Sequence, residues 1–174
     1  MMIITTNKYN FNPIEQMKKY ILLALVALAT AFGASAEAGD FSIGGQFAYA
    51  SKNSMAGLGA QLQYEPITNW RIAPEFIYYF ENDNLSAFNV NVNIHYVIPT
   101  SATFAIYPLA GFTYANFRAE VMGVSDNEGR CGANIGMGAQ YQIKEHLHFF
   151  TEERFQILKN WNQSVTCLGL KYTF

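Results

Sequence analysis

The sequence predicts an all-β protein, an eight-stranded antiparallel up-and-down transmembrane β-barrel preceded by a helical signal peptide. The first observation is composition: 16% of the 174 residues are aromatic and only 14% are charged, whereas about a quarter of a soluble domain is charged. The mean hydropathy is +0.03, which is too low for a bundle of membrane helices. The second observation is an export pattern at the N-terminus, and the third is an apolar alternation through the rest of the chain.

The N-terminal pattern is that of a signal peptide. Lys18 and Lys19 precede an apolar run over 21–32 that is interrupted by a single threonine. A Gly-Ala-Ser-Ala segment then ends at Ala36, so we expect cleavage between Ala36 and Glu37. The alternative is an uncleaved membrane anchor. The 17 uncharged residues between Lys19 and Glu37 are at the lower limit of length for a helix that spans a bilayer.

Residues 1–16 do not fit this pattern, because a signal peptide normally begins with its positive segment at the initiator methionine. We therefore expect translation to start at Met17, with 1–16 an upstream extension, 17–36 the signal peptide and 37–174 the mature barrel. The mature chain then has 8 basic and 12 acidic residues and a net charge of −4. This balance argues against nucleic-acid binding, which needs a basic surface. N-terminal sequencing of a precursor that begins at Met1 would refute the later start.

Beyond Glu37 the apolar alternation has the period of two that is typical of β-strands. It recurs in eight segments of about ten to twelve residues, the length at which a tilted strand crosses a bilayer. The segments are 41–50, 56–65, 71–80, 87–98, 104–115, 132–143, 147–158 and 165–174. The uncharged stretch between Asp83 and Arg118 could suggest a membrane helix, but its asparagines alternate and Pro99 and Pro108 interrupt it.

The two faces of these strands differ in a way that predicts which face points outward. One face is bulky and apolar, with Phe76, Val92 and Leu170 as examples, and the other is small or polar. Bulky residues outside and small polar residues inside suit a narrow barrel in lipid. Two alternatives remain open: a soluble lipocalin-like barrel, which would hold its apolar residues inside, and a soluble sandwich with one hydrated face.

Aromatic residues gather near both ends of the segments, where a bilayer interface favours them. The lower, periplasmic belt is Tyr64, Trp70, Tyr96, Tyr141, Tyr172 and Phe174, and the upper belt is Phe47, Tyr49, Tyr78, Phe80, Phe112 and Tyr114. Short turns are expected on the periplasmic side at 66–69, 99–102 and 144–146. The outer connections are 51–54, 81–86, 117–131 and 159–164, and the segment 117–131 is expected to be the longest loop.

The C-terminal segment carries the most specific motif. Leu168, Leu170, Tyr172 and the terminal Phe174 alternate on one face. With this ending, the chain resembles the small OmpA/OmpX-type, porin-like outer-membrane β-barrels of Gram-negative bacteria over residues 37–174. The resemblance implies that these four residues form a signal for the outer-membrane assembly machinery. It also implies a place in the bacterial outer membrane among lipids and lipopolysaccharide, with a role in envelope integrity, adhesion or host contact.

Three residues depart from a regular lipid-facing wall. Glu153 falls on the lipid-facing side in the middle of its segment, where a charge is costly. We expect either a bulge near Thr151 that turns Glu153 inward or an error in the assigned register. Pro74 and Pro108 lie inside segments of a closed sheet, each removing one backbone donor, so we expect local bulges there as well.

The inward face gathers a set of charged residues, namely Glu75, Glu152, Arg154 and Lys171, with Arg71 and Glu65 nearer the periplasmic end. These residues could form a path for protons or ions, or a network that neutralises itself and plugs the lumen. We favour the plug, because eight strands leave an interior just wide enough for side chains and buried charges persist only when they are paired.

Catalysis is not expected. A lipid A-modifying enzyme would need a histidine near the outer leaflet, paired with a serine and a carboxylate. His95, His146 and His148 all map to the periplasmic half. We expect no cofactor and no metal, because no Cys/His metal spacing occurs. The sequence does not decide whether Cys131 and Cys167 form a disulfide.

The outer loops hold the remaining binding potential. Val121, Met122 and Trp161 are the candidate contact residues, because loops on a rigid barrel are natural contact surfaces and exposed Trp is over-represented at binding hot spots. We therefore expect a monomeric structural or surface-interaction protein with a plugged lumen. A narrow channel for small or apolar solutes and a lipid A-modifying enzyme are the alternatives.

Overall fold

A computed structural model describes residues 39–82, 84–121 and 124–174. The signal peptide, the proposed start at Met17 and the cleavage site at Ala36 and Glu37 lie outside these residues. The strands are β1 (Phe41–Ala50), β2 (Met55–Ile67), β3 (Trp70–Asn82), β4 (Leu85–Tyr96), β5 (Ile98–Pro99), β6 (Phe104–Val121), β7 (Val124–Lys144), β8 (Leu147–Leu158) and β9 (Gln163–Thr173). No helix in the described part of the chain is long and apolar enough to cross a membrane.

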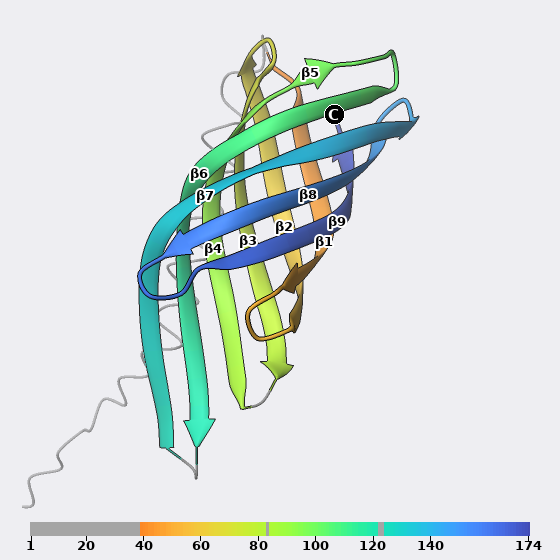
Figure 1. The fold of residues 1–174 in the computed structure, drawn as a ribbon. Coiled ribbons are helices and arrows are strands. Elements are labelled where there is room, and N and C mark those ends of the chain that lie inside the picture. Colours follow the sequence, from red (N-terminus) through yellow and green to blue (C-terminus); the bar gives the residue numbers. More distant parts are fainter. Residues whose placement is uncertain (1–38, 83, 122–123) are drawn as a thin grey trace, which may run out of the picture. The chain divides into compact units, whose positions relative to one another are not determined.

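The described strands form one closed antiparallel sheet (Figure 1). Each strand pairs with the next along the chain, except that β6 pairs with both β4 and the short β5. Because β1 also pairs with β9, the first and last strands close the barrel. The short β5 continues β4 in the same register, since the pair Ile98 and Ile106 extends the pair His95 and Leu109. The predicted eight-stranded antiparallel β-barrel is therefore confirmed, and no strand edge is left unpaired around its circumference.

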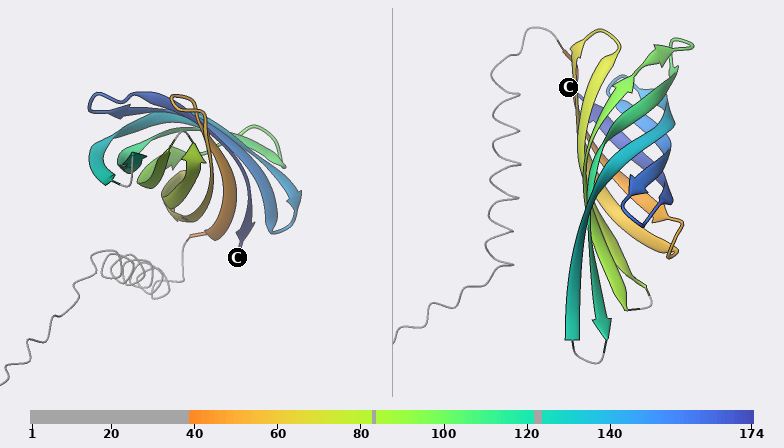
Figure 2. Two further views of the ribbon diagram at one scale, coloured as in Figure 1. Left: turned by 90° about the horizontal axis from the view of Figure 1, so that it is seen from below. Right: turned by 60° about the vertical axis from the view of Figure 1, so that its left-hand side comes forward.

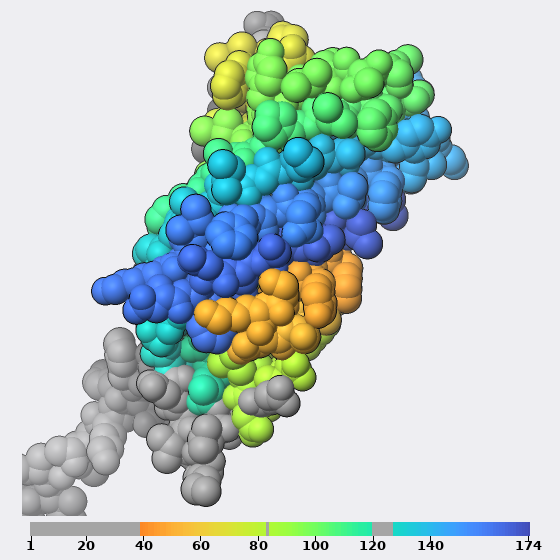
Figure 3. Space-filling view, viewed as in Figure 1, coloured from red at the N-terminus to blue at the C-terminus, as the bar shows by residue number. Residues whose placement is uncertain are grey.

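The strands are strongly tilted relative to the barrel axis (Figure 2). Following paired residues once around the barrel from Phe41 leads to Ser51, the residue after β1 and ten residues further along the chain. The path is Phe41, Tyr64, Ile72, Ile94, Ala110, Ile135, Phe155, Ser164 and Ser51. In a space-filling view the strands form oblique adjacent bands, and the last strand lies directly beside the first hairpin (Figure 3). This combination of strand number and stagger leaves a narrow interior.

The apolar face of the strands points outward, as predicted. Met137 is 68% exposed and Leu58 is 56% exposed, whereas Arg154 and Glu152 are each 1% exposed. The residues Val92 and Leu170 also lie on the outer surface. A soluble barrel or sandwich with these residues in its core is therefore excluded.

Aromatic contacts occur at both ends of the outer wall. In the lower belt the rings of Trp70 and Tyr96 lie 5.1 Å apart. In the upper belt the rings of Tyr78 and Phe80 lie 6.1 Å apart, and the ring of Tyr114 lies 6.3 Å from that of Phe88. Rings at these two levels match the interfaces of a bilayer.

The expected bulges at Pro74, Pro108 and Thr151 are wrong. Pro74 pairs with Val92 and Pro108 pairs with Met137, each within an uninterrupted register. In an antiparallel sheet the N–H of a residue points to only one neighbour, so a proline removes one bond without adding a residue. The pairing of β4 with β6 is interrupted opposite Pro108, and this interruption separates β5 from β4.

Glu153 remains on the outer face. The β7–β8 register runs without a shift from the pair of Gly132 and Leu158 to the pair of Gln142 and His148. The period-two alternation therefore predicted the outward position of Glu153 correctly. Neither the expected bulge near Thr151 nor an error in the register is present.

The predicted long loop at 117–131 is also wrong. Strands β6 and β7 continue to pair as far as Val121 and Val124 and form a two-stranded ribbon. The ribbon projects well beyond the turns that follow β1 and β8 (Figures 1 and 2). Its sequence resembled a loop because a ribbon outside the membrane meets water on both sides and needs no apolar alternation.

Candidate functional site

The centre of the lumen is built around Arg154 of β8. Its guanidinium group lies 2.5 Å from a carboxylate oxygen of Glu75 on β3 and 3.5 Å from one of Glu152. The two carboxylates accept further hydrogen bonds from neighbouring side chains. The donors are Gln46 and Asn91 to Glu75, at 3.0 and 2.6 Å, and the Tyr107 hydroxyl to Glu152, at 3.0 Å. The buried charges are thus paired, as a low-dielectric interior requires.

A second polar group lies nearer the periplasmic end. The Lys171 ammonium donates to the side-chain oxygens of Gln63 and Gln140, both at 2.7 Å. Arg71 donates to the same Gln140 oxygen at 3.0 Å and lies 3.4 Å from Glu65. The structure therefore divides the five predicted lumen residues into two groups. Arg154 joins Glu75 and Glu152, while Lys171 and Arg71 bind glutamines and Glu65.

Tyr107 connects the two groups, because its hydroxyl donates to Glu152 and the Arg71 guanidinium lies 5.9 Å from its ring centre. The space for its ring depends on a glycine opposite to it. Its ring stacks on that of His95 at 4.7 Å, with an interplanar angle of 14°. Gly138 on β7 faces this ring, and a Cβ atom at that position would lie 2.4 Å from it. The glycines on the inward face of β7 thus give the larger lumen side chains their space.

Amide side chains fill the lumen above the charged centre. Asn134 donates to the side-chain oxygens of Asn91 and Asn93 at 3.1 and 2.9 Å, and Gln163 donates to Gln156 at 2.8 Å. These residues are all at most 3% exposed. A continuous polar network therefore occupies the middle of the barrel, and this part of the lumen has no room for an open pore.

The outer end of the lumen has a different character. A buried apolar cluster crosses it, and its members come from seven strands and pack with Leu85 and Trp161. The cluster is Ala48, Ala50, Met55, Ile77, Tyr79, Ala87, Ala115, Phe117, Leu158, Val165 and Cys167. This apolar plug was not predicted, although the sequence carries a signal for it: the inward positions change from amides to Ile77, Tyr79, Leu158 and Val165 toward the outer end.

Trp161 covers this apolar cluster. Its ring packs on Phe117 at 4.8 Å, and the charged groups of Lys52 and Arg130 lie 4.2 and 5.1 Å from its centre. Its indole N–H donates to Gln163 at 3.3 Å. Trp161 is therefore half-buried at the outer mouth of the barrel rather than freely exposed, and its role as a contact residue stays a prediction.

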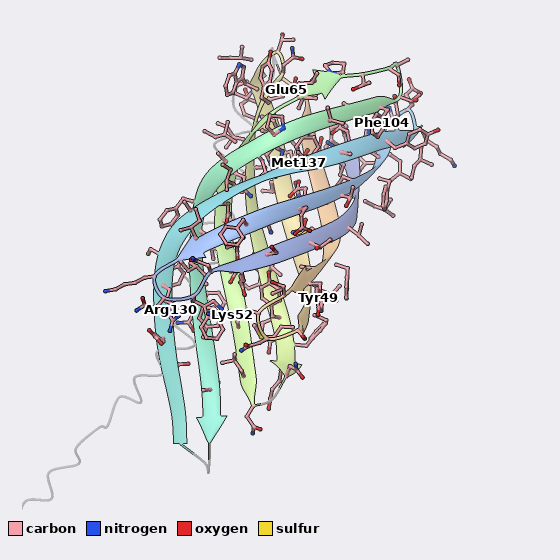
Figure 4. All side chains as sticks on the ribbon, viewed as in Figure 1. Tyr49, Lys52, Glu65, Phe104, Arg130 and Met137 are labelled. Atoms are coloured by element: carbon pink, nitrogen blue, oxygen red, sulfur yellow. The ribbon has the colours of Figure 1, made fainter. Side chains whose placement is uncertain are left out.

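The side chains of Lys52 and Arg130 both lie at the outer mouth, at the end of the barrel opposite to Glu65 (Figure 4). Arg130 also binds Glu128 in the projecting ribbon at 2.7 Å. This hydrogen bond lowers the pKa of the Glu128 carboxyl below its ordinary value. The side chains of Lys52, Arg130 and Trp161 thus link the turns after β1 and β8 to the base of the β6–β7 ribbon. Val121 ends β6 in this ribbon, and Met122 lies outside the described residues.

The two cysteines do not form a disulfide. Cys131 is exposed, Cys167 is buried in the lumen, and both are free. They lie on β7 and β9 with β8 between them, so the open possibility of a bridge is excluded. The Cys167 sulfur instead lies 3.5 Å from the Arg154 guanidinium.

The three histidines do not assemble with other groups into a metal site. His95 lies in the lumen, His146 lies in the turn after β7, and His148 is the second residue of β8, on the inward face. Within residues 39–82, 84–121 and 124–174, no cluster of three or more His, Cys, Asp or Glu side chains could hold a metal ion.

The C-terminal motif lies on the outer wall. Leu168, Leu170, Tyr172 and Phe174 are each between 46% and 69% exposed. They line one face of β9 next to β1, at the seam where the barrel closes. Recognition of these residues by the assembly machinery remains a prediction.

Comparison with known proteins agrees with this architecture. Residues 20–174 match the family model described as the outer membrane protein beta-barrel domain. The N-terminal β-barrel domain of OprF from Pseudomonas aeruginosa is similar in structure, with a TM-score of 0.69, 17% identity, and coverage of 79% of this chain and 100% of that chain.

Two further barrels are similar. Ail, the attachment invasion locus protein of Yersinia pestis, has a TM-score of 0.60 and 17% identity over 78% of this chain and 97% of its own. Neisserial surface protein A has a TM-score of 0.62 and 15% identity, with the same coverage. No curated protein matches the chain. From its matched residues and its closed barrel, the chain belongs to the outer membrane β-barrel protein family and is a protein of the bacterial outer membrane.

Proposed function

We propose that this protein is a structural and surface-interaction component of the outer membrane, and that its contact element is the projecting β6–β7 ribbon. The barrel anchors the ribbon among lipids and lipopolysaccharide and does not itself perform chemistry. Envelope integrity and adhesion are the two roles consistent with this family, and the ribbon favours adhesion.

The observation that carries this proposal is a strand edge without a neighbour at the outer surface. The pairing of β7 with β8 ends at Gly132 and Leu158, whereas its pairing with β6 continues to Val124. Among the described strands, none pairs with the β8-facing edge of β7 from Val124 to Cys131. Unpaired strand edges bind extended segments of other chains by adding a strand.

The ribbon also offers charged groups beside this edge. Arg118, Asn127 and Glu128 have exposed side chains, and Arg130 anchors the base of the ribbon against Trp161. A rigid barrel that holds such a ribbon above the membrane favours binding, because less conformational freedom is lost on contact.

One relative supports a role in contact. Ail is named an attachment invasion locus protein, and it has also been crystallised in complex with sucrose octasulfate, a heparin analogue. At 17% identity this likeness shows the fold alone. The unpaired edge of β7 and the charges beside it therefore carry the proposal.

The lumen supports the non-channel part of the proposal. Hydrogen-bonded charges and amides occupy its middle, and the apolar cluster under Trp161 occupies its outer end. A solute would have to displace both layers to cross the barrel.

Adhesion of bacteria that display the protein tests this function. A strain without its own adhesins would express the intact chain or a variant in which a two-residue turn replaces residues 119–128. We expect the intact chain to increase binding to cultured epithelial cells and to immobilised heparin, and the truncated variant to lose this increase. Heat-modifiable gel mobility would verify that both barrels fold.

A matched control retains the length of the ribbon but scrambles the order of residues 119–128. Retained adhesion would assign the contact to the strand edge, and lost adhesion would assign it to the side chains. The proposal is contradicted if the intact chain binds no better than the empty strain, or if truncation leaves binding unchanged.

A further inference from the structure

The backbone groups at the open edge of the β6–β7 ribbon can be assigned to particular residues. In an antiparallel ladder, alternate residues direct their N–H and C=O groups to opposite neighbours. The N–H of Gln142 donates to the C=O of Thr103, on the β6 side, so the even-numbered residues of β7 face β6. The β6–β7 register has no shift from Tyr141 to Val124. The same assignment therefore holds along the whole ribbon.

The odd-numbered residues of the ribbon consequently face the open edge. Gly132 is the outermost residue of β7 that pairs with β8. In the described part of the chain, no strand lies beside the N–H and C=O groups of Ser125, Asn127 and Gly129. Pro and Lys, which often protect exposed strand edges, are absent from 124–131. Donors and acceptors that alternate at strand spacing complement the backbone of one further extended chain.

The face of the ribbon toward the barrel axis carries negative charge beside this edge. Glu128 lies opposite Phe117, which is buried in the outer mouth, and the Glu128 side chain is 64% exposed. Asp126 takes the next position on the same face. Arg130 donates to Glu128 and packs on Trp161. With two acidic residues and one arginine, this face of the open strand has a net charge of −1.

The charge changes along the edge and differs between its faces. On the opposite face the open strand is neutral, with Ser125, Asn127, Gly129 and Cys131. Near the base of the ribbon the surroundings are positive, because Lys159 directly follows β8 and Lys52 lies against Trp161. A partner strand therefore meets negative charge at two positions only, and both are away from the base and on one face.

We propose that this edge binds an extended segment of another protein that carries two basic residues, two positions apart, opposite Glu128 and Asp126. The segment adds a strand to β7 and bonds to the backbone of Ser125, Asn127 and Gly129. Opposite charges at facing positions stabilise the added strand and fix its register. A second copy of the chain fits less well, since its own edge adds two further acidic residues. The inference rests on the proposed function, because it names the partner of the same edge.

Amide hydrogen exchange tests the added strand residue by residue. The isotopically labelled barrel in lipid nanodiscs would receive a capped peptide of sequence Thr-Thr-Val-Lys-Thr-Lys-Thr, or a control peptide with Glu in place of both Lys residues. With saturating Lys peptide, exchange of the amides of Asn127 and Gly129 should become about tenfold slower. The amides of Glu128 and Arg130 face β6, so their exchange should change little.

Two pairs of variants separate backbone pairing from charge. Asn127→Pro removes one edge N–H but no bond to β6, and Pro74 and Pro108 show that strands of this sheet accept proline. It should weaken binding of the Lys peptide about tenfold, whereas Asn127→Ala retains the N–H and should bind normally. Glu128→Gln should weaken binding about two- to fivefold. Arg118→Gln, on the other face of the ribbon, should not weaken it.

Three outcomes would overturn the proposal. The first is that the Lys peptide binds no better than the Glu peptide. The second is binding without slower exchange at Asn127 and Gly129, which would assign the contact to side chains. The third is slow exchange at these amides before peptide is added, increasing with protein concentration, which would identify a second copy as the occupant. Gel mobility of unheated samples would show that each variant forms a folded barrel.

The adhesion assay keeps this inference distinct from the proposed function. If replacing residues 119–128 abolishes adhesion but Asn127→Pro does not, the ribbon is the contact element and the added strand is wrong. If that replacement leaves adhesion unchanged while the Lys peptide binds the edge as expected, the edge is a peptide site and the adhesive role is wrong.

Discussion

The middle and the outer end of the lumen are both filled, but by different kinds of interaction. In the middle, Arg154 and two carboxylates are held by specific partners at specific distances. At the outer end, Leu158 and its neighbours fill the space by apolar packing. The lumen of this narrow barrel is therefore blocked at two levels, by charge pairing in its middle and by apolar packing at its outer end. Substitutions in the two layers should therefore fail for different reasons.

The largest effect is expected in the charged layer. Arg154→Met removes the cation that neutralises Glu75 and Glu152, and leaves two buried carboxylates with no counter-charge between them. The free energy of unfolding should fall by about 3–5 kcal/mol, measured by urea unfolding of the refolded barrel in lipid vesicles. A triple variant with Arg154→Met, Glu75→Gln and Glu152→Gln should recover most of this loss. If the single and triple variants were equally unstable, charge pairing would not be the source of the stability.

In the apolar layer, shortening a buried side chain should reduce the stability of the barrel. Leu158 is 3% exposed in the outer cluster, and Leu158→Ala should reduce the free energy of unfolding by about 2–5 kcal/mol through the cavity that remains. Ile157→Ala, one residue away on the lipid-facing side, is the matched control and should cost less, because lipid fills the space. Equal losses in the two variants would show that the outer end of the lumen is not packed.

A smaller effect is expected where the two polar groups meet at Tyr107. Gly138→Ala would place a methyl group 2.4 Å from the Tyr107 ring, and this overpacking should cost about 1–3 kcal/mol. Gly45→Ala is the control, because a methyl group there meets nothing within 4 Å. Urea midpoints of the two variants, compared with that of the unmodified protein, provide the measurement. A Gly138→Ala barrel as stable as Gly45→Ala would contradict the close approach of β7 to Tyr107.

The smallest effect concerns the residue that covers the apolar layer. Trp161→Ala removes the contacts with Lys52 and Arg130, each worth about 0.5–1 kcal/mol at exposed sites. We expect a small loss of stability and faster cleavage of the turn between β8 and β9 by an added protease in intact cells. Trp161→Phe should retain most of the protection. Unchanged cleavage in Trp161→Ala would show that the ring does not hold the turn.

The sequence predicted the barrel because its wall separates two media. Outward positions such as Val92 and Leu170 must be apolar, and inward positions such as Asn91 must be polar or small, so alternation determines the face of each strand. The same rule predicts that Glu153 points outward, and the structure confirms it. No bulge turns this residue inward.

The features that the sequence did not predict lie where this rule does not apply. Outside the membrane the ribbon faces water on both sides, so residues 117–131 resembled a loop. Inside the outer mouth, Ile77 and Leu158 are apolar on the inward face, because the plug needs packing there. Pairing partners in the lumen, such as Arg154 with Glu75, depend on strand stagger, which period-two alternation does not specify.

The most direct test of the two-layer closure is single-channel recording in a planar bilayer. The account predicts no steady open conductance for the intact protein, because Arg154 with its two carboxylates and the cluster under Trp161 each block the lumen. A stable, porin-like open level in most insertion events would contradict it.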